Sequence, residues 1–345
     1  MSTATELTRT VPPQPAFDIT RAAFIELRVA DLDASEHFYA DLLGMIVSAR
    51  TDDAVFLRGW EERQHHSLIL RRGTFAAVSR LGFRVRRPED LDRLAAFAEG
   101  KGLTTRWTLA EDNDPGFGCS LRLWDPFGYP LEFVCTVEQF EHRHQRFDLQ
   151  RGAPLLRFEH LNIHSHEVEP MFRWWLELGF RCSEYISTDD PANELITGAW
   201  LFRKPSVHDM ALTAGRGPRL HHFAYWVGEP AGVLRACDQL AGGDHAQVIE
   251  RGPGRHGVSN AFFVYLRDPD GHRIELYSCD YYTGDDDHLP IRWSVNDSRC
   301  RSFWGTRAPD SWYDESSVLL GPGGEPVATR DAGVDERTQH SQVFT

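Results

Sequence analysis

Two stretches of this chain show the same order of hydrophobic and polar positions. Residues 25–45 begin with apolar residues at alternate positions, pass through a polar turn and continue with apolar residues three or four positions apart, and residues 161–180 do the same. Alternation is typical of a half-buried β-strand, and the wider spacing is typical of an amphipathic α-helix. The pattern therefore predicts a strand and then a helix in each stretch, and it indicates an internal repeat.

Three further pairs of similar segments follow in the same order and at a nearly constant offset. They are residues 66–73 and 208–215, residues 80–102 and 220–243, and residues 120–134 and 262–278. The last pair contains Asp-Pro-Phe-Gly and Asp-Pro-Asp-Gly, which predict turns between paired strands because Pro presets the turn and Gly supplies a positive φ. We therefore predict an α+β fold of tandem βαβββ modules, two in each half, that form two cupped mixed-sheet barrels around a concave site.

The repeat also predicts the domain boundaries. We expect an N-terminal arm over residues 1–20, a first repeat domain over 21–140, a second over 155–282, and a lid with a C-terminal tail over 283–345. The tail is rich in Pro and Gly over residues 321–345, and we expect it to be mobile or wrapped on a neighbour.

The two halves differ at positions that could carry chemistry. In the second half, His160 and His222 open two strands, and Glu275 lies in the last strand just after a turn. The corresponding positions of the first half hold Phe24, Gly82 and Glu132. A histidine needed by the scaffold would recur in both halves, so two histidines confined to one half indicate a site. We predict that His160, His222 and Glu275 bind a metal, which makes the second repeat domain catalytic and leaves the first without metal.

These residue types indicate which metal to expect. Two imidazoles and one carboxylate are the facial ligand set of non-haem Fe(II) oxygenases, and Mn(II) fits the same ligands. A structural zinc site would need four protein ligands, often cysteines. A single strand histidine is more often a packed residue than a ligand, and because side chains alternate we expect the neighbouring His221 to face away from His222, which aligns with Gly82. The predicted cofactor is Fe(II), with Mn(II) as the alternative.

More polar residues of the second half accompany the predicted ligands. His208 falls on a strand, and a later segment contributes Arg251, Tyr265 and, from a Gly-rich loop, His256. For two of these residues, Tyr265 and His208, a purely structural role is the alternative. Tyr265 alone fits a core tyrosine equally well, and His66, the first-half counterpart of His208, fits a histidine that the scaffold prefers.

Composition narrows the classes of function. The chain has 345 residues with a formal net charge of −14, and no run rich in Lys or Arg offsets it, so we predict no nucleic-acid partner. No apolar run approaches the ~20 residues of a membrane span, and the N-terminus lacks the apolar stretch of a signal peptide, so we predict no membrane partner. Six scattered cysteines without a CxxC pair predict reduced thiols. Together these features predict a cytoplasmic protein.

Several blocks of sequence carry a family resemblance that covers nearly the whole chain. They include RFEHLNIHS, AWLFRKPSVHDMALT, GPRLHHFAYWV and RCRSFWG, and above all GPGRHGVSNAF and DPDGHRIELY. The chain resembles the type I extradiol ring-cleavage dioxygenases of the vicinal oxygen chelate superfamily, and within them the homoprotocatechuate (3,4-dihydroxyphenylacetate) 2,3-dioxygenase branch. The resemblance implies a homotetramer with an iron site in the C-terminal half, and some relatives use manganese.

The resemblance also implies roles for individual residues. The implied metal ligands are His160, His222 and Glu275. The implied catalytic residues are His208 as acid/base, with Tyr265 and His256 as hydrogen-bonding partners of substrate and intermediates. The implied substrate-binding residues are Asn162, Trp200, Arg251, His256 and Arg301. The two arginines are the implied anchors for a side-chain carboxylate, since a guanidinium fork suits that group.

The activity implied by the resemblance is extradiol cleavage of a carboxylate-bearing catechol, with 3,4-dihydroxyphenylacetate as the substrate. Both atoms of O2 would enter the product, a 2-hydroxymuconic semialdehyde. Two alternatives stay open: an extradiol dioxygenase for another catechol, and an isomerase or non-catalytic binding member of the same fold. Residues 283–307 carry Arg301 and several aromatics, and we predict that they close over the pocket as a lid, the alternative being a subunit-contact loop.

Overall fold

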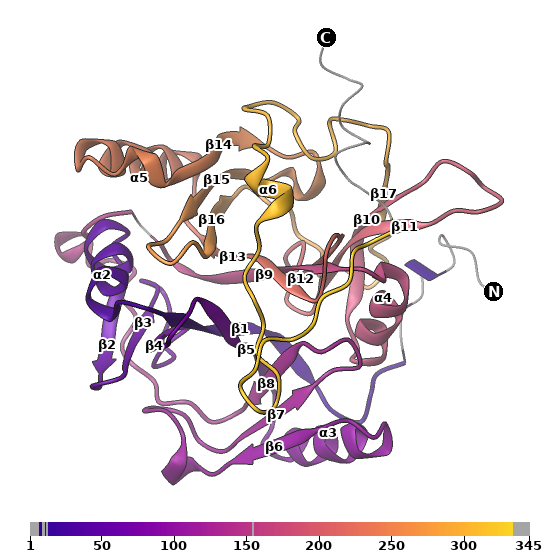
Figure 1. The fold of residues 1–345 in the computed structure, drawn as a ribbon, viewed down its shortest axis with the longest axis horizontal. Coiled ribbons are helices and arrows are strands. Elements are labelled where there is room, and N and C mark those ends of the chain that lie inside the picture. The colour runs from indigo at the N-terminus through magenta and orange to yellow at the C-terminus, as the bar shows by residue number, and fades with distance from the viewer. Residues whose placement is uncertain (1–6, 9–10, 12, 154, 334–345) are drawn as a thin grey trace.

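The computed structural model describes residues 7–8, 11, 13–153 and 155–333, and Figure 1 shows two β-sheets, one from each half of the chain. The first sheet has the order β2 (Ile46–Arg50), β3 (Ala54–Arg58), β4 (Leu68–Arg72), β1 (Ile19–Val29), β5 (Ala77–Val85), β8 (Pro130–Val134), β7 (Ser120–Trp124) and β6 (Thr105–Thr108). The second has the order β14 (Ile249–Arg255), β15 (Phe262–Arg267), β16 (Arg273–Ser278), β13 (Arg219–Trp226), β9 (Arg157–Ser165), β12 (Met210–Ala214), β11 (Ile196–Phe202), β10 (Arg181–Ser187) and β17 (Ile291–Ser294).

Helices are few and short beside the sheets. They are α2 (Leu32–Glu36), which continues into a π-helical turn (His37–Leu42), α3 (Glu89–Gly100), α4 (Val168–Glu177), α5 (Pro230–Gly242) and α6 (Ser311–Asp314). Single 3₁₀ turns cover Ala110–Asp112, Phe147–Leu149, Ala246–Val248 and Val258–Asn260. Helix α2 begins where the Asp31 side chain accepts hydrogen bonds from two backbone N–H groups that the first turn leaves unpaired.

The two sheets share one pattern of strand pairing. In the first, β1 pairs parallel with β4 and antiparallel with β5, and β5 pairs parallel with β8. In the second, β9 pairs parallel with β12 and antiparallel with β13, and β13 pairs parallel with β16. Both sheets are therefore mixed and built on the same connections, which confirms the predicted α+β fold of tandem modules.

The two Asp-Pro tetrapeptides form the predicted turns. Asp125 Oδ1 accepts hydrogen bonds from the backbone N–H groups two and four residues further on, both at 2.9 Å, and Asp268 Oδ1 does the same at 3.0 and 2.7 Å. The last residues of the two turns, Gly128 and Gly271, have φ values of +93° and +83°, a region that favours glycine. These turns set the register of the strand pairs that follow them.

Side chains from both halves meet in one continuous hydrophobic core. Trp175 of α4 is fully buried, and its ring centroid lies 5.5 Å from that of Phe83 on β5. The Tyr39 hydroxyl of the first half donates a hydrogen bond of 2.8 Å to Asp268 of the second. The two sheets therefore support one another as parts of a single folded unit.

The described part of the C-terminal tail packs on its own chain. The segment from Ser317 to Leu320 pairs with both sheets: Ser317 N–H donates to Leu220 of β13 at 2.8 Å, and Leu320 N–H donates to Val78 of β5 at 3.0 Å. Further along, Arg330 and Gly217 exchange two backbone hydrogen bonds. The expectation of a mobile tail is therefore wrong for the residues up to 333, and its wrapping on a neighbour stays a prediction. Residues 334–345 lie outside the described part of the chain.

The domain boundaries remain a prediction, and one strand from beyond the boundary at residue 282 joins the second sheet. β17 lies in the segment expected to form a lid and pairs parallel with β10 at the edge of the second sheet. Of the predicted arm, residues 1–6, 9–10 and 12 lie outside the described part. No helix among the described residues is both long and apolar enough to cross a membrane.

Candidate active site

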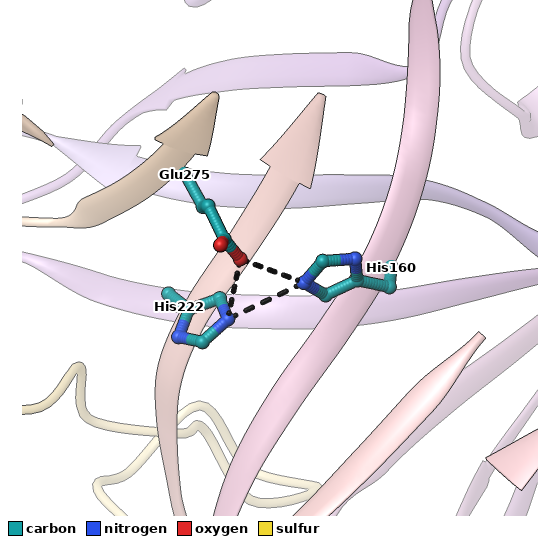
Figure 2. A group of neighbouring side chains, drawn as sticks. All are labelled: His160, His222 and Glu275. Atoms are coloured by element: carbon teal, nitrogen blue, oxygen red, sulfur yellow. Dashed lines mark hydrogen bonds and ion pairs between the residues drawn. The ribbon is translucent and has the colours of Figure 1, made fainter. Parts of the chain in front are cut away.

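Three neighbouring strands bring the predicted metal ligands together. His160 Nε2 lies 3.0 Å from Glu275 Oε2 and 3.4 Å from His222 Nε2, and His222 Nε2 lies 3.2 Å from the same carboxylate oxygen. Figure 2 shows the three side chains pointing toward one point from β9, β13 and β16. The strand register explains the geometry, because Ala224 of β13 is paired with His160 on one side and Glu275 on the other.

The chemistry of this cluster fits a bound metal ion. All three residues are at least 97% buried, and burial lowers the pKa of both histidines, which keeps them neutral with free lone pairs. Burial raises the pKa of Glu275, but the adjacent imidazole of His222 outweighs it and holds that pKa below its ordinary value. Glu275 Oε1 is buried without a hydrogen-bond partner among the described residues. A buried carboxylate between neutral imidazoles needs a cation, and these donors suit a divalent metal.

His221 corrects one expectation, because it does not face away from His222. The two Nδ1 atoms lie 2.6 Å apart, and both residues line the same pocket. The pairing of β13 with β9 shifts register between Leu220 and His222, and such a bulge re-aims side chains. Strict alternation therefore fails at this point of the strand.

The contacts of His221 assign the tautomer of the ligand beside it. His221 Nε2 lies 3.1 Å from the Trp312 carbonyl oxygen, which can only accept, so this nitrogen carries the proton. Burial holds the pKa of His221 well below its usual value, so its Nδ1 is an unprotonated acceptor for the Nδ1–H of His222. That arrangement leaves the lone pair of His222 on Nε2, the atom that faces Glu275 and His160. Such outer hydrogen bonds orient metal-binding histidines.

The register of the first sheet corrects a second expectation. Gly82 is paired with Glu132 as Ala224 is with Glu275, so Gly82 corresponds to Ala224 and not to His222. The position of the first half that corresponds to His222 is occupied by Arg80. The correspondence expected from the sequence was therefore two residues out of step in this strand. A shift of two residues keeps every side chain on its own face, so the hydrophobic pattern does not reveal it. Phe24 keeps its place opposite Gly82, as His160 does opposite Ala224.

All ten residues predicted for the site line a single pocket. They are His160, Asn162, Trp200, His208, His222, Arg251, His256, Tyr265, Glu275 and Arg301. The structure thus brings them together from six strands, from the loops that hold His208 and His256, and from the segment after β17, while the role of each remains a prediction. The expectation that His208 falls on a strand is wrong, because it lies in the loop just before β12.

His208 stands beside the metal ligands. Its ring centroid lies 3.9 Å from that of His160, and its Nδ1 is buried without a hydrogen-bond partner among the described residues. Burial, followed by the neighbouring His160, holds the pKa of His208 well below its ordinary value. The ring is therefore a neutral imidazole, which can accept a proton.

His256 and Tyr265 form a hydrogen-bonded pair at the pocket wall. His256 Nδ1–H donates to the carbonyl oxygen of Arg301, so the Nε2 atom accepts from the Tyr265 hydroxyl at 2.9 Å. Burial lowers the pKa of His256 to about 3 and raises that of Tyr265, so both stay neutral. The His256 ring also stacks on Phe263 with centroids 3.9 Å apart. These contacts hold the pair rigidly and tie it to the segment that carries Arg301.

Arg251 is a buried cation without a carboxylate partner among the described residues. It is 4% exposed and lies over the rings of Trp312 and Phe263, at 4.3 and 5.2 Å. Its Nη2 donates to Ser302 Oγ at 2.6 Å and to the Arg301 carbonyl at 3.2 Å, but its Nε has no partner among the described residues. Buried charges in proteins are normally paired, so this guanidinium is suited to an anionic ligand.

Sequence reasoning missed seven residues that line the pocket. They are His164, Thr213, His221, Val258, Ser259, Tyr277 and Trp312. Tyr277 could have been found, since it lies two residues after Glu275 on the same face of β16. Trp312 gave no such signal, because it lies on a helix of only four residues outside the repeat.

The match to known proteins covers both halves of the chain. Residues 21–133 and 157–276 each match the model of the Glyoxalase/Bleomycin resistance protein/Dioxygenase superfamily. The chain belongs to this superfamily. Within the superfamily the chain is an extradiol dioxygenase. A similar solved structure is that of an extradiol ring-cleaving dioxygenase from B. fuscum. The resemblance noted from the sequence is confirmed.

Relatives of known activity span nearly the full length of the chain. A manganese-dependent 2,3-dihydroxybiphenyl 1,2-dioxygenase from Geobacillus genomosp. 3 is 33% identical over 83% of this chain and 94% of its own. A metapyrocatechase from Geobacillus stearothermophilus is 30% identical over 92% and 97%. Homoprotocatechuate 2,3-dioxygenase from Brevibacterium fuscum, solved as an anaerobic complex with 3,4-dihydroxyphenylacetate, is 42% identical with a TM-score of 0.88, over 93% of this chain and all of that one.

Proposed function

We propose that this dioxygenase binds Fe(II) at His160, His222 and Glu275 and cleaves the ring of a catechol that carries a carboxylate, with 3,4-dihydroxyphenylacetate as the substrate. The observation that carries the proposal is the buried His–His–Glu cluster beside a buried, unpaired guanidinium. The cluster accounts for the metal, and the guanidinium accounts for the carboxylate. Mn(II) fits the same three ligands and is the alternative metal.

The bound divalent ion would favour the deprotonated diol and hold the two reactants at adjacent positions. The chain's own part is to place the ring and to move protons around it. His208, as a neutral imidazole, accepts a proton from the substrate and returns it when the O–O bond breaks. His256 holds the Tyr265 hydroxyl at the pocket wall, so that the Tyr265 oxygen can accept a hydrogen bond from a substrate hydroxyl, while Asn162 and Trp200 line the space for the ring.

Arg251 and Arg301 would bind the substrate carboxylate. Arg251 has an unused Nε–H in a buried setting, where a charge-assisted hydrogen bond is strong. The backbone carbonyl of Arg301 is held by Arg251 and His256 together. Binding of the carboxylate would therefore order the segment that carries Arg301, in agreement with its proposed role as a lid over the pocket.

Metal loading followed by oxygen uptake tests the proposal. The metal of the purified protein is identified by mass spectrometry, and metal-free protein is reloaded anaerobically with Fe(II) or Mn(II). We expect oxygen uptake and a yellow semialdehyde with 3,4-dihydroxyphenylacetate, and a much lower kcat/KM with its methyl ester. No uptake with any catechol under either metal would overturn the dioxygenase assignment, and equal kcat/KM for acid and ester would overturn the carboxylate. The expected homotetramer and cytoplasmic location remain predictions, the first open to light scattering.

A further inference from the structure

A second cavity adjoins the active-site pocket. Arg251, Arg301 and Trp312 line both cavities, so these three residues form the wall between them. On the outer side the second cavity, here called the outer vestibule, is lined among others by Ser302, Thr306 and Arg307. None of the described residues that line it is acidic, although the chain as a whole carries a net charge of −14. The vestibule is therefore a local exception to the acidic character of the protein.

The arginines of the vestibule differ from others in the same segment. Arg292 and Arg299 form ion pairs with carboxylates at 2.8–3.1 Å. Arg307 is exposed and forms no hydrogen bond or ion pair with any described residue, and Arg251 has no carboxylate of the described residues within ion-pair distance. Arg251, in the wall between the two cavities, and Arg307, at the outer rim, thus both lack a carboxylate partner among the described residues.

We propose that the outer vestibule is an anion-capture subsite, in which Arg307 binds the carboxylate of an incoming catechol before it passes Trp312 and Arg301 to reach Arg251. This inference rests on the proposed function only for the anionic class of the substrate. A protein with a net charge of −14 repels an anion at long range, and a cationic cavity mouth reverses the field where the substrate enters. Arg307 is a specificity-determining residue that acts on association, not on the chemical step.

The test compares an anionic with an uncharged substrate in the full-length, metal-loaded enzyme. Arg307→Gln is expected to lower kcat/KM for 3,4-dihydroxyphenylacetate about fivefold at low ionic strength, with kcat unchanged. The kcat/KM for 4-methylcatechol is expected to stay the same. The loss should shrink as salt is raised to about 0.5 M, since exposed charges are then screened within a few ångströms. Arg307→Lys should retain most of the wild-type value, because capture needs charge more than geometry.

A matched control separates local capture from net charge. Arg235 is exposed on α5 and lies outside both cavities, so Arg235→Gln makes the same change in charge elsewhere. We expect this variant to match wild type with both substrates. An equal loss in both variants, an equal loss with both substrates, or a loss in kcat alone would each overturn the proposal.

A binding measurement keeps the inference separate from the proposed function. The association rate of 3,4-dihydroxyphenylacetate without oxygen is followed by quenching of tryptophan fluorescence, for which Trp312 lies in the shared wall. Slower association in Arg307→Gln supports capture even if no catechol is turned over, in which case only the proposed function fails. An unchanged association rate overturns capture even if the enzyme cleaves its substrate as proposed.

Discussion

The two halves of the molecule hold a buried carboxylate at the same position and balance it in different ways. In the first half, Arg80 and Arg122 form ion pairs with Glu132 at 3.4 and 2.6 Å. In the second, Glu275 faces neutral histidines, and one of its oxygens has no hydrogen-bond partner among the described residues. A buried carboxylate requires a compensating cation. The first half supplies that cation from its own side chains, and the second is arranged to take it as a metal ion.

The space around the carboxylate differs as well. Phe24 stands where the second half has His160, and its ring packs against Phe117 with centroids 5.0 Å apart. Gly82 makes room for it, since a Cβ there would lie 2.1 Å from a carbon of the Phe24 ring. The volume that forms a pocket in the second half is filled by aromatic side chains in the first. The half without the predicted metal site thus has both an internal cation that balances its carboxylate and aromatic side chains that fill its cavity.

The largest expected effect comes from removing the charge of the second carboxylate. Glu275→Gln is expected to weaken metal binding by at least about 100-fold and to reduce oxygen uptake to background, because a neutral amide offers no compensating charge. The measurements are metal content after dialysis and oxygen uptake. Glu132→Gln is the matched control in the other half and should keep its full metal content. Metal retained in the first variant and lost in the second would reverse the assignment of the two halves.

The second-largest effect is expected from removal of Arg80, a cation that balances Glu132 in the first half. Arg80→Met leaves Glu132 and Glu26 buried with one guanidinium fewer, and is expected to lower the free energy of unfolding by about 3–5 kcal/mol. Urea titration measures the change, and metal content per folded molecule should stay the same. Arg86→Met, which removes an exposed ion pair with Asp18, should cost less than about 1 kcal/mol. If Arg80→Met lowered the free energy of unfolding by no more than Arg86→Met does, the first half would not depend on its internal cation.

A smaller effect is expected at the residue that orients a metal ligand. His221→Phe removes the acceptor for the His222 Nδ1–H and is expected to raise the metal dissociation constant about 10- to 100-fold. Competition with a chelator measures it, and His221→Gln should recover part of the loss because its amide can still hydrogen-bond. The exposed His142 provides a control, since His142→Phe should leave the constant unchanged. Equal constants in all variants would remove His221 from the metal site.

The smallest effect concerns pH. Burial raises the pKa of Glu132, but the charges of Arg80 and Arg122 outweigh it and hold that pKa below its ordinary value. Stability from a depressed carboxyl pKa is present above the unfolded value of about 4.3 and is lost as pH falls through the folded value. The stability gap between wild type and Arg80→Met should therefore be constant from pH 8 to 6 and narrow by about 1 kcal/mol below pH 4. Urea titrations across that range decide it, and a constant gap down to pH 3 would contradict the pairing.

Much of the fold was accessible from the sequence because the repeat doubles each signal. Paired segments of the same pattern predicted the tandem modules, and the two Asp-Pro turns were found in place. The seven candidate site residues that lie on strands also meet in one pocket, because strand alternation fixes which side chains share a face. These features depend on periodicity and on local turn chemistry, which a single sequence displays.

The features that were missed depend on register and on long-range packing. A slip of two residues leaves a strand's faces unchanged, so the match of Arg80 with His222 could not be read from hydrophobic pattern. The bulge that brings His221 to the pocket interrupts alternation without any glycine or proline to mark it. The position of Trp312 is fixed by contacts with distant strands, among them the carbonyl that binds His221.

The C-terminal segment that pairs with both sheets has a consequence for how the enzyme folds during its synthesis. Translation delivers His160, His222 and Glu275 early, but Trp312 and the Ser317–Leu320 segment that pairs with both sheets emerge later. A nascent chain that has not yet extended to Trp312 therefore lacks the carbonyl that orients His221. Domains form as they emerge during synthesis, whereas this metal centre acquires its complete set of supports only after the segment that follows the repeat has emerged.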